Sequence, residues 1–121
     1  MNKQGGMNGT GLILITTKTI GGVKMISLIL WEADNALFPA DPEERMKLIM
    51  SMAEGVKKNL ESKTFTMWGI SAGGGQGFTV SEKEPREIYA ATAPYFPYIK
   101  FEITPMLSID EMIDTMKSMQ Q

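Results

Sequence analysis

From residue 25 onward, apolar residues recur along the chain with two different periods, and polar or glycine-rich stretches separate the resulting segments. Short apolar or alternating runs predict strands, and apolar positions at steps of three and four predict helices. Proline, glycine and capping residues mark the ends of these elements. The predicted strands span 25–32, 64–72, 78–80 and 99–104, and the predicted helices begin after Asp41, at about Glu84 and at Ser108.

The first helix has the clearest pattern. Asp41 is a favourable N-cap, and Pro42 suits the first helical position. Glu43 and Glu44 suit the positive end of the helix dipole. Gly55 lies inside the helix and marks either a close approach of another element or a tolerated surface position. The apolar stripe predicted to face the core consists of Met46, Ile49, Ala53, Val56 and Leu60.

The glycine-rich run 73–77 lies between the second and third predicted strands. This position favours a hairpin turn, because tight turns need the positive φ that glycine adopts without strain. A phosphate-binding loop is the alternative, but such loops lead into a helix and carry a Lys-Ser/Thr pair or a third spaced glycine. Here a strand follows and no such lysine does, so a hairpin is predicted.

Prolines bound the elements of the second half. Pro85 suits the first turn of the helix over 84–93, and Pro94 and Pro97 terminate that helix. Pro105 is predicted to close the strand that follows. The predicted inner faces are Ile88, Ala91 and Thr92 in this helix, Phe101 and Ile103 in the last strand, and Met112, Ile113, Met116 and Met119 in the last helix.

The element order is β-α-β-β-α-β, followed by a C-terminal helix that a capping box at Ser108 and Glu111 begins. This order predicts an α+β, ferredoxin-like fold, in which both main helices cover one face of a four-stranded antiparallel sheet. The first strand, 25–32, is almost continuously apolar, so its other face also needs cover. We therefore expect a homodimer that pairs through the open face of the sheet.

Residues 1–24 differ in composition from the 97 residues that follow. They hold six of the 12 glycines and three lysines but no acidic residue, whereas 25–121 has nine Lys and Arg against 14 Asp and Glu. Residues 21–25 are also what a purine-rich ribosome-binding sequence would encode if it were read in frame. The leader 1–24 is therefore interpreted as a segment that is not native, with a natural start at Met25, or as an extra strand beside the domain 25–121.

The residue types that are missing limit the possible chemistry. The chain has no histidine and no cysteine, which excludes a Ser-His-Asp triad, a thiolate nucleophile, disulfides and the common metal and haem ligands. We expect no cofactor and no metal. The net charge of −2 and the lack of a long apolar run argue against binding to nucleic acid or to a membrane. The absence of cysteine fits a cytoplasmic location.

Three groups of residues carry a resemblance to known proteins: 40–44, then Trp68-Gly69 with the glycines that follow, and 94–105 with 108–111. Together they resemble the ferredoxin-like dimeric α/β-barrel superfamily, especially its small functionally uncharacterised bacterial and archaeal members, and more distantly the muconolactone isomerases. The resemblance implies sheet-to-sheet pairing, with pockets between sheet and helices. The superfamily has many activities, and several depend on a histidine that this chain lacks, so no catalytic residue carries over.

Five aromatic residues form the candidate ligand-binding set. Aromatic side chains line pockets for small apolar ligands, and they are also common in cores and dimer interfaces. The set consists of Trp31, Trp68, Tyr95, Phe96 and Tyr98.

The weak candidates for catalysis are Glu32, Glu102 and Tyr95. The two glutamates lie toward the ends of strands that can be neighbours in the sheet, and paired carboxylates in a closed pocket can act as acid and base. The commoner explanation is an exposed strand end or an ion pair with Lys100 or Arg86. An enzyme would need one of these acids, or the tyrosine, inside a cavity with a shifted protonation equilibrium.

These features lead to one expected function and two alternatives. The expected function is a homodimeric protein that binds a small apolar or aromatic molecule between sheet and helices. The first alternative is a cofactor-independent isomerase or monooxygenase that acts on a small organic substrate. The second is a structural or protein-interaction module, which would have no cavity and would present an apolar patch outside the dimer interface.

Overall fold

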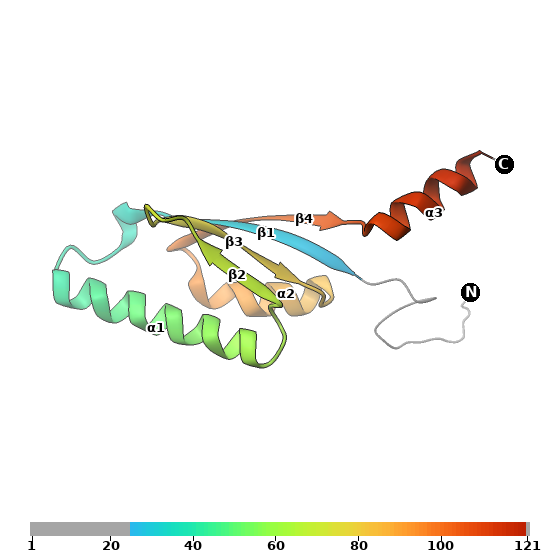
Figure 1. Ribbon diagram of the computed structural model, residues 1–121. Coiled ribbons are helices and arrows are strands. Elements are labelled where there is room, and N and C mark those ends of the chain that lie inside the picture. The colour runs from blue at the N-terminus through green and yellow to red at the C-terminus, as the bar shows by residue number, and fades with distance from the viewer. Residues whose placement is uncertain (1–24, 121) are drawn as a thin grey trace. The chain divides into compact units, whose positions relative to one another are not determined.

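The computed structural model describes residues 25–120, which form four strands, three α-helices and two short 3-10 turns (Figure 1). Residues 27–105 form one compact unit, and residues 106–120 belong to another. The elements are β1 (Ile26–Ala33), the turn η2 (Asn35–Leu37), α1 (Pro42–Glu61), β2 (Met67–Ile70), β3 (Gln76–Ser81), α2 (Pro85–Thr92), the turn η3 (Ala93–Tyr95), β4 (Ile99–Met106) and α3 (Ile109–Met119).

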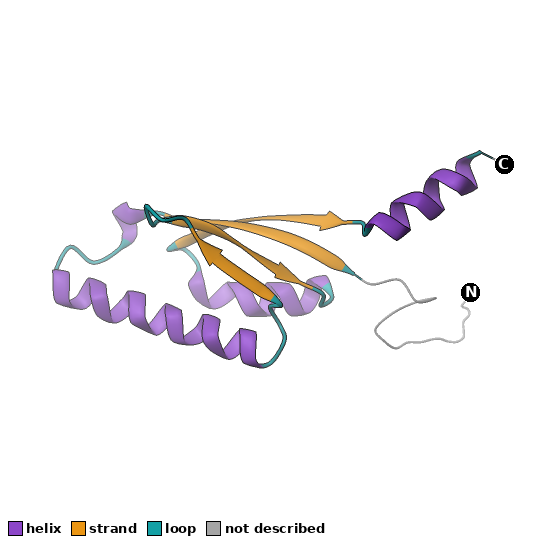
Figure 2. Cartoon of the chain, in the orientation of Figure 1, coloured by secondary structure: helices purple, strands orange, loops and turns teal. Residues whose placement is uncertain are grey.

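The four strands form one antiparallel sheet in the order β2-β3-β1-β4. Helices α1 and α2 both lie on one side of this sheet, and no described element of residues 27–105 covers the other side (Figure 2). The predicted α+β class, with a βαββαβ order and a C-terminal helix, is therefore confirmed. The arrangement is compatible with a ferredoxin-like fold.

The register of β1 on β3 divides the strand residues between the two faces of the sheet. Ile29 is paired with Thr79 and Trp31 with Gly77, and these residues face the helices. Leu30 is paired with Phe78 and lies on the open face. Since side chains alternate along a strand, the continuous apolar run of the first strand supplies both faces.

The core lies between the sheet and α2. Ile29, Phe65 and Ile88 are fully or almost fully buried and contact one another, and partly buried neighbours pack around them. Helix α2 buries Ile88 and Thr92, as predicted from the sequence. The Thr92 hydroxyl donates a hydrogen bond of 3.0 Å to the carbonyl oxygen of Ile88, so the polar group is satisfied inside the helix. The partly buried neighbours are Leu60, Ala91 and Phe101.

Helix α1 begins as predicted, but its predicted core stripe is not buried. The Asp41 carboxylate accepts a hydrogen bond of 3.0 Å from the backbone N–H of Glu44. No residue of the 20-residue helix is buried, and Met46 and Ile49 are 58% and 40% exposed. Leu60 packs against the buried core, as predicted. For the rest of the stripe the prediction of a packed inner face was wrong, because a cavity separates it from the sheet.

Strand β2 is shorter than the predicted 64–72, because the residues before it end helix α1. Lys63 has a φ of 65°, which terminates the helix, and the Phe65 N–H donates a hydrogen bond of 3.0 Å to the carbonyl of Asn59. The hairpin between β2 and β3 is confirmed. Gly74 and Gly75 have φ values of 79° and 84°, which side chains rarely tolerate.

Strand β4 continues through Pro105 to Met106, so the prediction that Pro105 closes the strand was wrong. The physical reason is the position of β4 at the edge of the sheet. An edge strand turns one row of backbone groups away from its neighbour, so a residue without an N–H can be accommodated.

Helix α3 has the predicted capping box, in which Ser108 and Glu111 each accept a backbone hydrogen bond from the other residue. Its predicted inner face is exposed, which corrects the sequence-based expectation. A stripe shows which side of a helix is apolar, but the chain itself need not supply the surface that covers it. The exposed stripe consists of Met112, Ile113, Met116 and Met119.

None of the described helices is long and apolar enough to cross a membrane. Residues 1–24 lie outside the described part of the chain. The interpretation of this leader as non-native or as an extra strand stays a prediction, as does the cytoplasmic location.

Candidate functional site: a cavity beneath helix α1

A cavity of about 450 Å³ lies between helix α1 and the helix-facing side of the sheet. This volume falls in the range of pockets for small organic ligands. Four residues of the predicted α1 stripe contribute to its wall, so the stripe was found correctly but faces a space instead of a packed core. Those residues are Ile49, Ala53, Val56 and Leu60.

Two stacked tryptophans form part of the sheet side of the cavity. The rings of Trp31 in β1 and Trp68 in β2 have centroids 5.5 Å apart and are almost parallel, at 13°. Strand β3 runs between them, and its Gly77 makes the stacking possible. A Cβ atom at Gly77 would lie 2.7 Å from the Trp31 ring and would overlap the carbonyl oxygen of Gly69. The glycine therefore lets an indole lie flat across the middle strand.

The indole N–H of Trp31 is buried and has no hydrogen-bond partner among the described residues. An unpaired buried donor costs on the order of 1–3 kcal/mol. The nitrogen is covered by surrounding atoms, so the ring presents apolar surface to its neighbours. The Trp31 ring thus contributes area and shape to the cavity, and no accessible polar group.

Tyr95 fixes the distance between helix α1 and the sheet. It is 8% exposed, and its hydroxyl forms a hydrogen bond with the Asn59 side chain. A Cβ atom at Gly55 would lie 2.5 Å from the hydroxyl oxygen. The sequence left two readings of Gly55 open, and the structure shows the close approach. Burial raises the pKa of the Tyr95 phenol, and the hydrogen bond from Asn59 opposes part of that rise.

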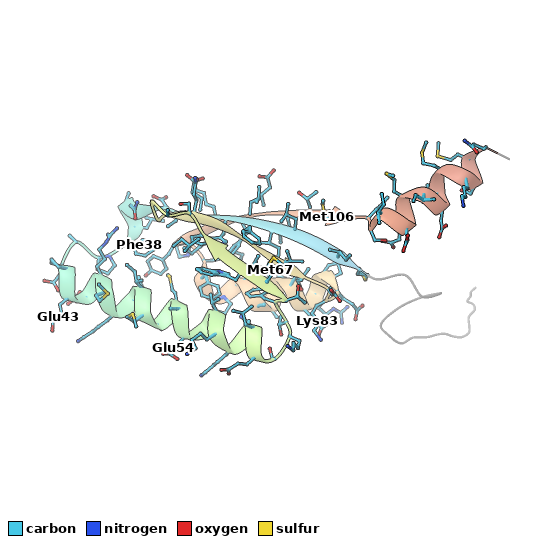
Figure 3. The ribbon with its side chains drawn as sticks, viewed as in Figure 1. Phe38, Glu43, Glu54, Met67, Lys83 and Met106 are labelled. Atoms are coloured by element: carbon cyan, nitrogen blue, oxygen red, sulfur yellow. The ribbon has the colours of Figure 1, made fainter. Side chains whose placement is uncertain are left out.

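Phe38 closes one end of the cavity, and the sequence gave no reason to select it. It is a single buried aromatic residue in the loop between β1 and α1, near the start of the helix (Figure 3). Arg45 lies over its ring at 5.1 Å and donates a hydrogen bond of 2.8 Å to the side-chain oxygen of Asn35. An aromatic side chain in this loop was the available signal.

The five candidate ligand-binding aromatics do not all line the cavity. Trp31, Trp68 and Tyr95 do. Phe96 and Tyr98 do not line the cavity, but each packs edge-on against a residue that does. Phe96 contacts Phe101 at 5.9 Å between ring centroids, and Tyr98 contacts Phe38 at 5.6 Å. Two further lining residues that the sequence did not single out are Met52 and Thr79.

The candidate catalytic residues lie on opposite faces of the sheet. Glu32 and Glu102 are exposed and line a separate hollow on the open face, together with Lys100. Their strands, β1 and β4, are neighbours, as the sequence suggested. Tyr95 lines the cavity on the other face. The three residues therefore do not form one site, and the cavity is lined by no carboxylate from the described chain.

The polar side chains around the cavity are mostly engaged within the protein. The Thr79 hydroxyl donates a hydrogen bond of 2.7 Å to the carbonyl oxygen of Met67. The Asn35 oxygen accepts from Arg45, and the Tyr95 hydroxyl is paired with Asn59. This arrangement can hold an apolar molecule, and the titratable side chains in the wall are those of Lys57 and Tyr95.

Comparison with known proteins gives one result at the level of the family. None of the curated proteins matches this chain. The model of one family, described as a domain of unknown function (DUF3303), matches residues 28–120, which include every described strand and helix apart from the first two residues of β1. The chain therefore belongs to the DUF3303 family.

Proposed function

We propose that the protein binds a small apolar or aromatic molecule in the cavity beneath α1, and that it does so as a homodimer within the ferredoxin-like dimeric α/β-barrel superfamily. The observation that carries the first part is the cavity itself, with about 450 Å³ of space inside a domain of ordinary size. Well-packed cores contain few voids larger than a water molecule. An apolar space of this size favours an organic occupant over water.

The character of the wall supports a binding function. Aromatic and aliphatic side chains supply most of it, and the titratable side chains that line it are Lys57 and Tyr95. The raised pKa of Tyr95 keeps its phenol neutral, so it is poorly suited to accept or release a proton near neutral pH. Shape and apolar contact therefore supply the affinity.

Fluorescence of the neutral probe N-phenyl-1-naphthylamine tests this function. The probe brightens when it enters an apolar environment, and we expect saturable binding to the folded protein. Ala53 lines the cavity on α1, whereas Ala90 lies exposed on α2. Ala53→Phe should fill part of the space and weaken probe binding at least tenfold. Ala90→Phe is the matched control and should leave binding unchanged.

The proposal is wrong if the folded wild-type protein does not enhance probe fluorescence. It is also wrong if Ala53→Phe and Ala90→Phe bind the probe equally well, because the probe would then bind elsewhere. Near-ultraviolet circular dichroism of each variant, which reports the environment of the two tryptophans, shows whether it keeps its tertiary structure.

The open face of the sheet supports the proposed homodimer. Leu30 and Met67 are 44% and 55% exposed on this face, and Phe78 lies between them over Gly69. A second copy would present the same residues, so a two-fold pair matches apolar with apolar area. The exposed Glu32 and Glu102 stand at the margin of this apolar area and can remain near solvent.

Sedimentation equilibrium tests the pairing. The wild-type chain should be a dimer at micromolar concentration, and Leu30→Lys should convert it to a monomer, because a buried unpaired charge is strongly unfavourable. Met46 is similarly exposed and lies on helix α1, away from the open face of the sheet, so Met46→Lys is the matched control and should remain dimeric. A wild-type monomer, or a dimer that survives Leu30→Lys, would contradict this interface.

An isomerase or monooxygenase is the second candidate, and the position of Tyr95 in the cavity wall is the observation that favours it. Its neutral hydroxyl accepts a hydrogen bond from Asn59 and so keeps its own proton to donate to a substrate oxygen. Mass spectrometry of a bound compound after prolonged incubation separates the two functions. A binding protein returns the compound unchanged, whereas an enzyme converts it, and Tyr95→Phe should then lower the rate.

A further inference from the structure

Lys57 is the one charged residue that lines the cavity within the described chain. It lies on α1 and is exposed, so its ammonium group stands where the cavity meets solvent. Two other lining residues, Ile49 on α1 and Ile70 on β2, are also exposed, at 40% and 53%. The cavity therefore opens between α1 and the edge strand β2, and Lys57 lies at this opening.

The ammonium group of Lys57 has no ion pair among the described residues. Two carboxylates lie within helical reach on the same helix, Glu54 three residues before it and Glu61 four residues after it, and neither is paired with it. Arg45, the other cation near the cavity, is engaged with Asn35 and Phe38. Lys57 is thus the free cation at the entrance of an apolar space.

We propose that the ligand is an amphiphilic anion, with an aromatic or aliphatic body in the cavity and one acidic group, such as a carboxylate, at the opening beside Lys57. This inference rests on the proposed binding function and specifies its ligand class. Burial of the body supplies most of the affinity. The ion pair orients the molecule with its charge toward water, so no charge is transferred into the apolar interior.

A matched pair of probes tests the ligand class. 8-Anilinonaphthalene-1-sulfonate has the same aromatic body as N-phenyl-1-naphthylamine and adds one sulfonate, which stands in for the carboxylate. Lys57→Met keeps the length of the side chain and removes its charge. We expect it to weaken sulfonate binding about threefold to fivefold, as an exposed ion pair would, and to leave binding of the neutral probe unchanged.

Lys58 supplies the control, because it is an exposed lysine on the same helix that does not line the cavity. Lys58→Met should change neither affinity. Raising the salt concentration from about 0.1 to 1 M, which shortens the Debye length from about 10 to 3 Å, should weaken sulfonate binding to the wild type and have little effect on Lys57→Met.

The possible results separate the two proposals. If both probes bind and Lys57→Met leaves the sulfonate affinity unchanged, the inference about an acidic group is wrong and the binding function stands. If Lys58→Met weakens sulfonate binding as much as Lys57→Met does, the attraction is diffuse and the inference is again wrong. If neither probe binds the folded wild-type protein, the binding function fails, and the ligand class fails with it.

Discussion

Helices α1 and α2 lie on the same side of one sheet, yet they relate to it in opposite ways. Helix α2, with eight residues, buries Ile88 and Thr92 to 2% and 1% exposure. Helix α1, with 20 residues, buries none. Both are amphipathic, so the difference is not one of pattern. It shows that an apolar stripe can face either a packed core or a ligand-sized space.

The contrast has a structural cause in the side chains that separate α1 from the sheet. Tyr95 lies against Gly55, and its hydroxyl forms a hydrogen bond with the side chain of Asn59, one turn further along α1. On the sheet, the Trp31 and Trp68 rings lie stacked across β3. These bulky side chains hold α1 away from the sheet, so the space between the helix and the sheet is not filled. On the α2 side, Ile29 and Ile88 contact directly.

Truncation of one residue on each helix should give the largest effect. Ile88→Ala removes buried methyl groups from the packed side and should lower the free energy of unfolding by about 2–5 kcal/mol. Val56→Ala, at the cavity wall, should cost about 1 kcal/mol or less, because its side chain already lacks neighbours on one side. Urea denaturation measures both. Equal losses would show that α1 is packed as tightly as α2.

The stacking of Trp31 on Trp68 can be disrupted by a substitution at Gly77. Gly77→Ala places a methyl group against the Trp31 ring and against the backbone carbonyl oxygen of Gly69. It should lower the free energy of unfolding by about 3 kcal/mol, the upper end for overpacked sites, because a backbone atom cannot move aside as a side chain can. The exciton signal of the stacked indoles in circular dichroism should also weaken. Gly73→Ala is the control, because its Cβ would meet nothing within 4 Å. An unchanged exciton signal in Gly77→Ala would contradict this role of Gly77.

The contact between Gly55 and Tyr95 can be tested with one substitution, whose effect on the free energy of unfolding should change sign when Tyr95 is replaced. Gly55→Ala should destabilise the wild type by about 1 kcal/mol, because the new methyl group meets the Tyr95 hydroxyl. In a Tyr95→Phe background that contact is gone, and alanine should instead stabilise the helix by up to about 1 kcal/mol. Thermal unfolding of the four proteins gives the coupling. Additive effects would mean that Gly55 and Tyr95 act independently.

The smallest expected effect is a pH dependence from Tyr95. Its pKa is raised in the folded protein, so the folded state holds the proton more tightly than the unfolded state. Stability from this group is therefore complete below the ordinary tyrosine pKa of about 10 and is lost as the pH rises through the folded value. Urea denaturation at increasing alkaline pH should show a steeper loss for the wild type than for Tyr95→Phe. Tyr89→Phe, at an exposed tyrosine, should retain the wild-type slope.

The helix caps and the hairpin turn could be predicted from the residues in their immediate neighbourhood. The caps at Asp41 and Ser108 and the glycine turn before β3 occur where the sequence predicted them, because each depends on a few neighbouring residues. The element order was enough to give the α+β fold with a four-stranded sheet and both main helices on one face (Figure 2). Boundaries were less accurate at 64–66 and at Pro105, where the end of α1 and the edge position of β4 decided the outcome.

The sequence by itself also determined that the α1 stripe is apolar and that an aromatic run, 95–98, precedes the last strand. Only the tertiary structure decided that the stripe faces a cavity, that Trp31 reaches Trp68 across Gly77, and that Glu32 and Tyr95 lie on opposite faces of the sheet. The reason is physical. Periodicity defines which side of an element is apolar, whereas the distance to the next element depends on the bulk of residues that are remote in sequence.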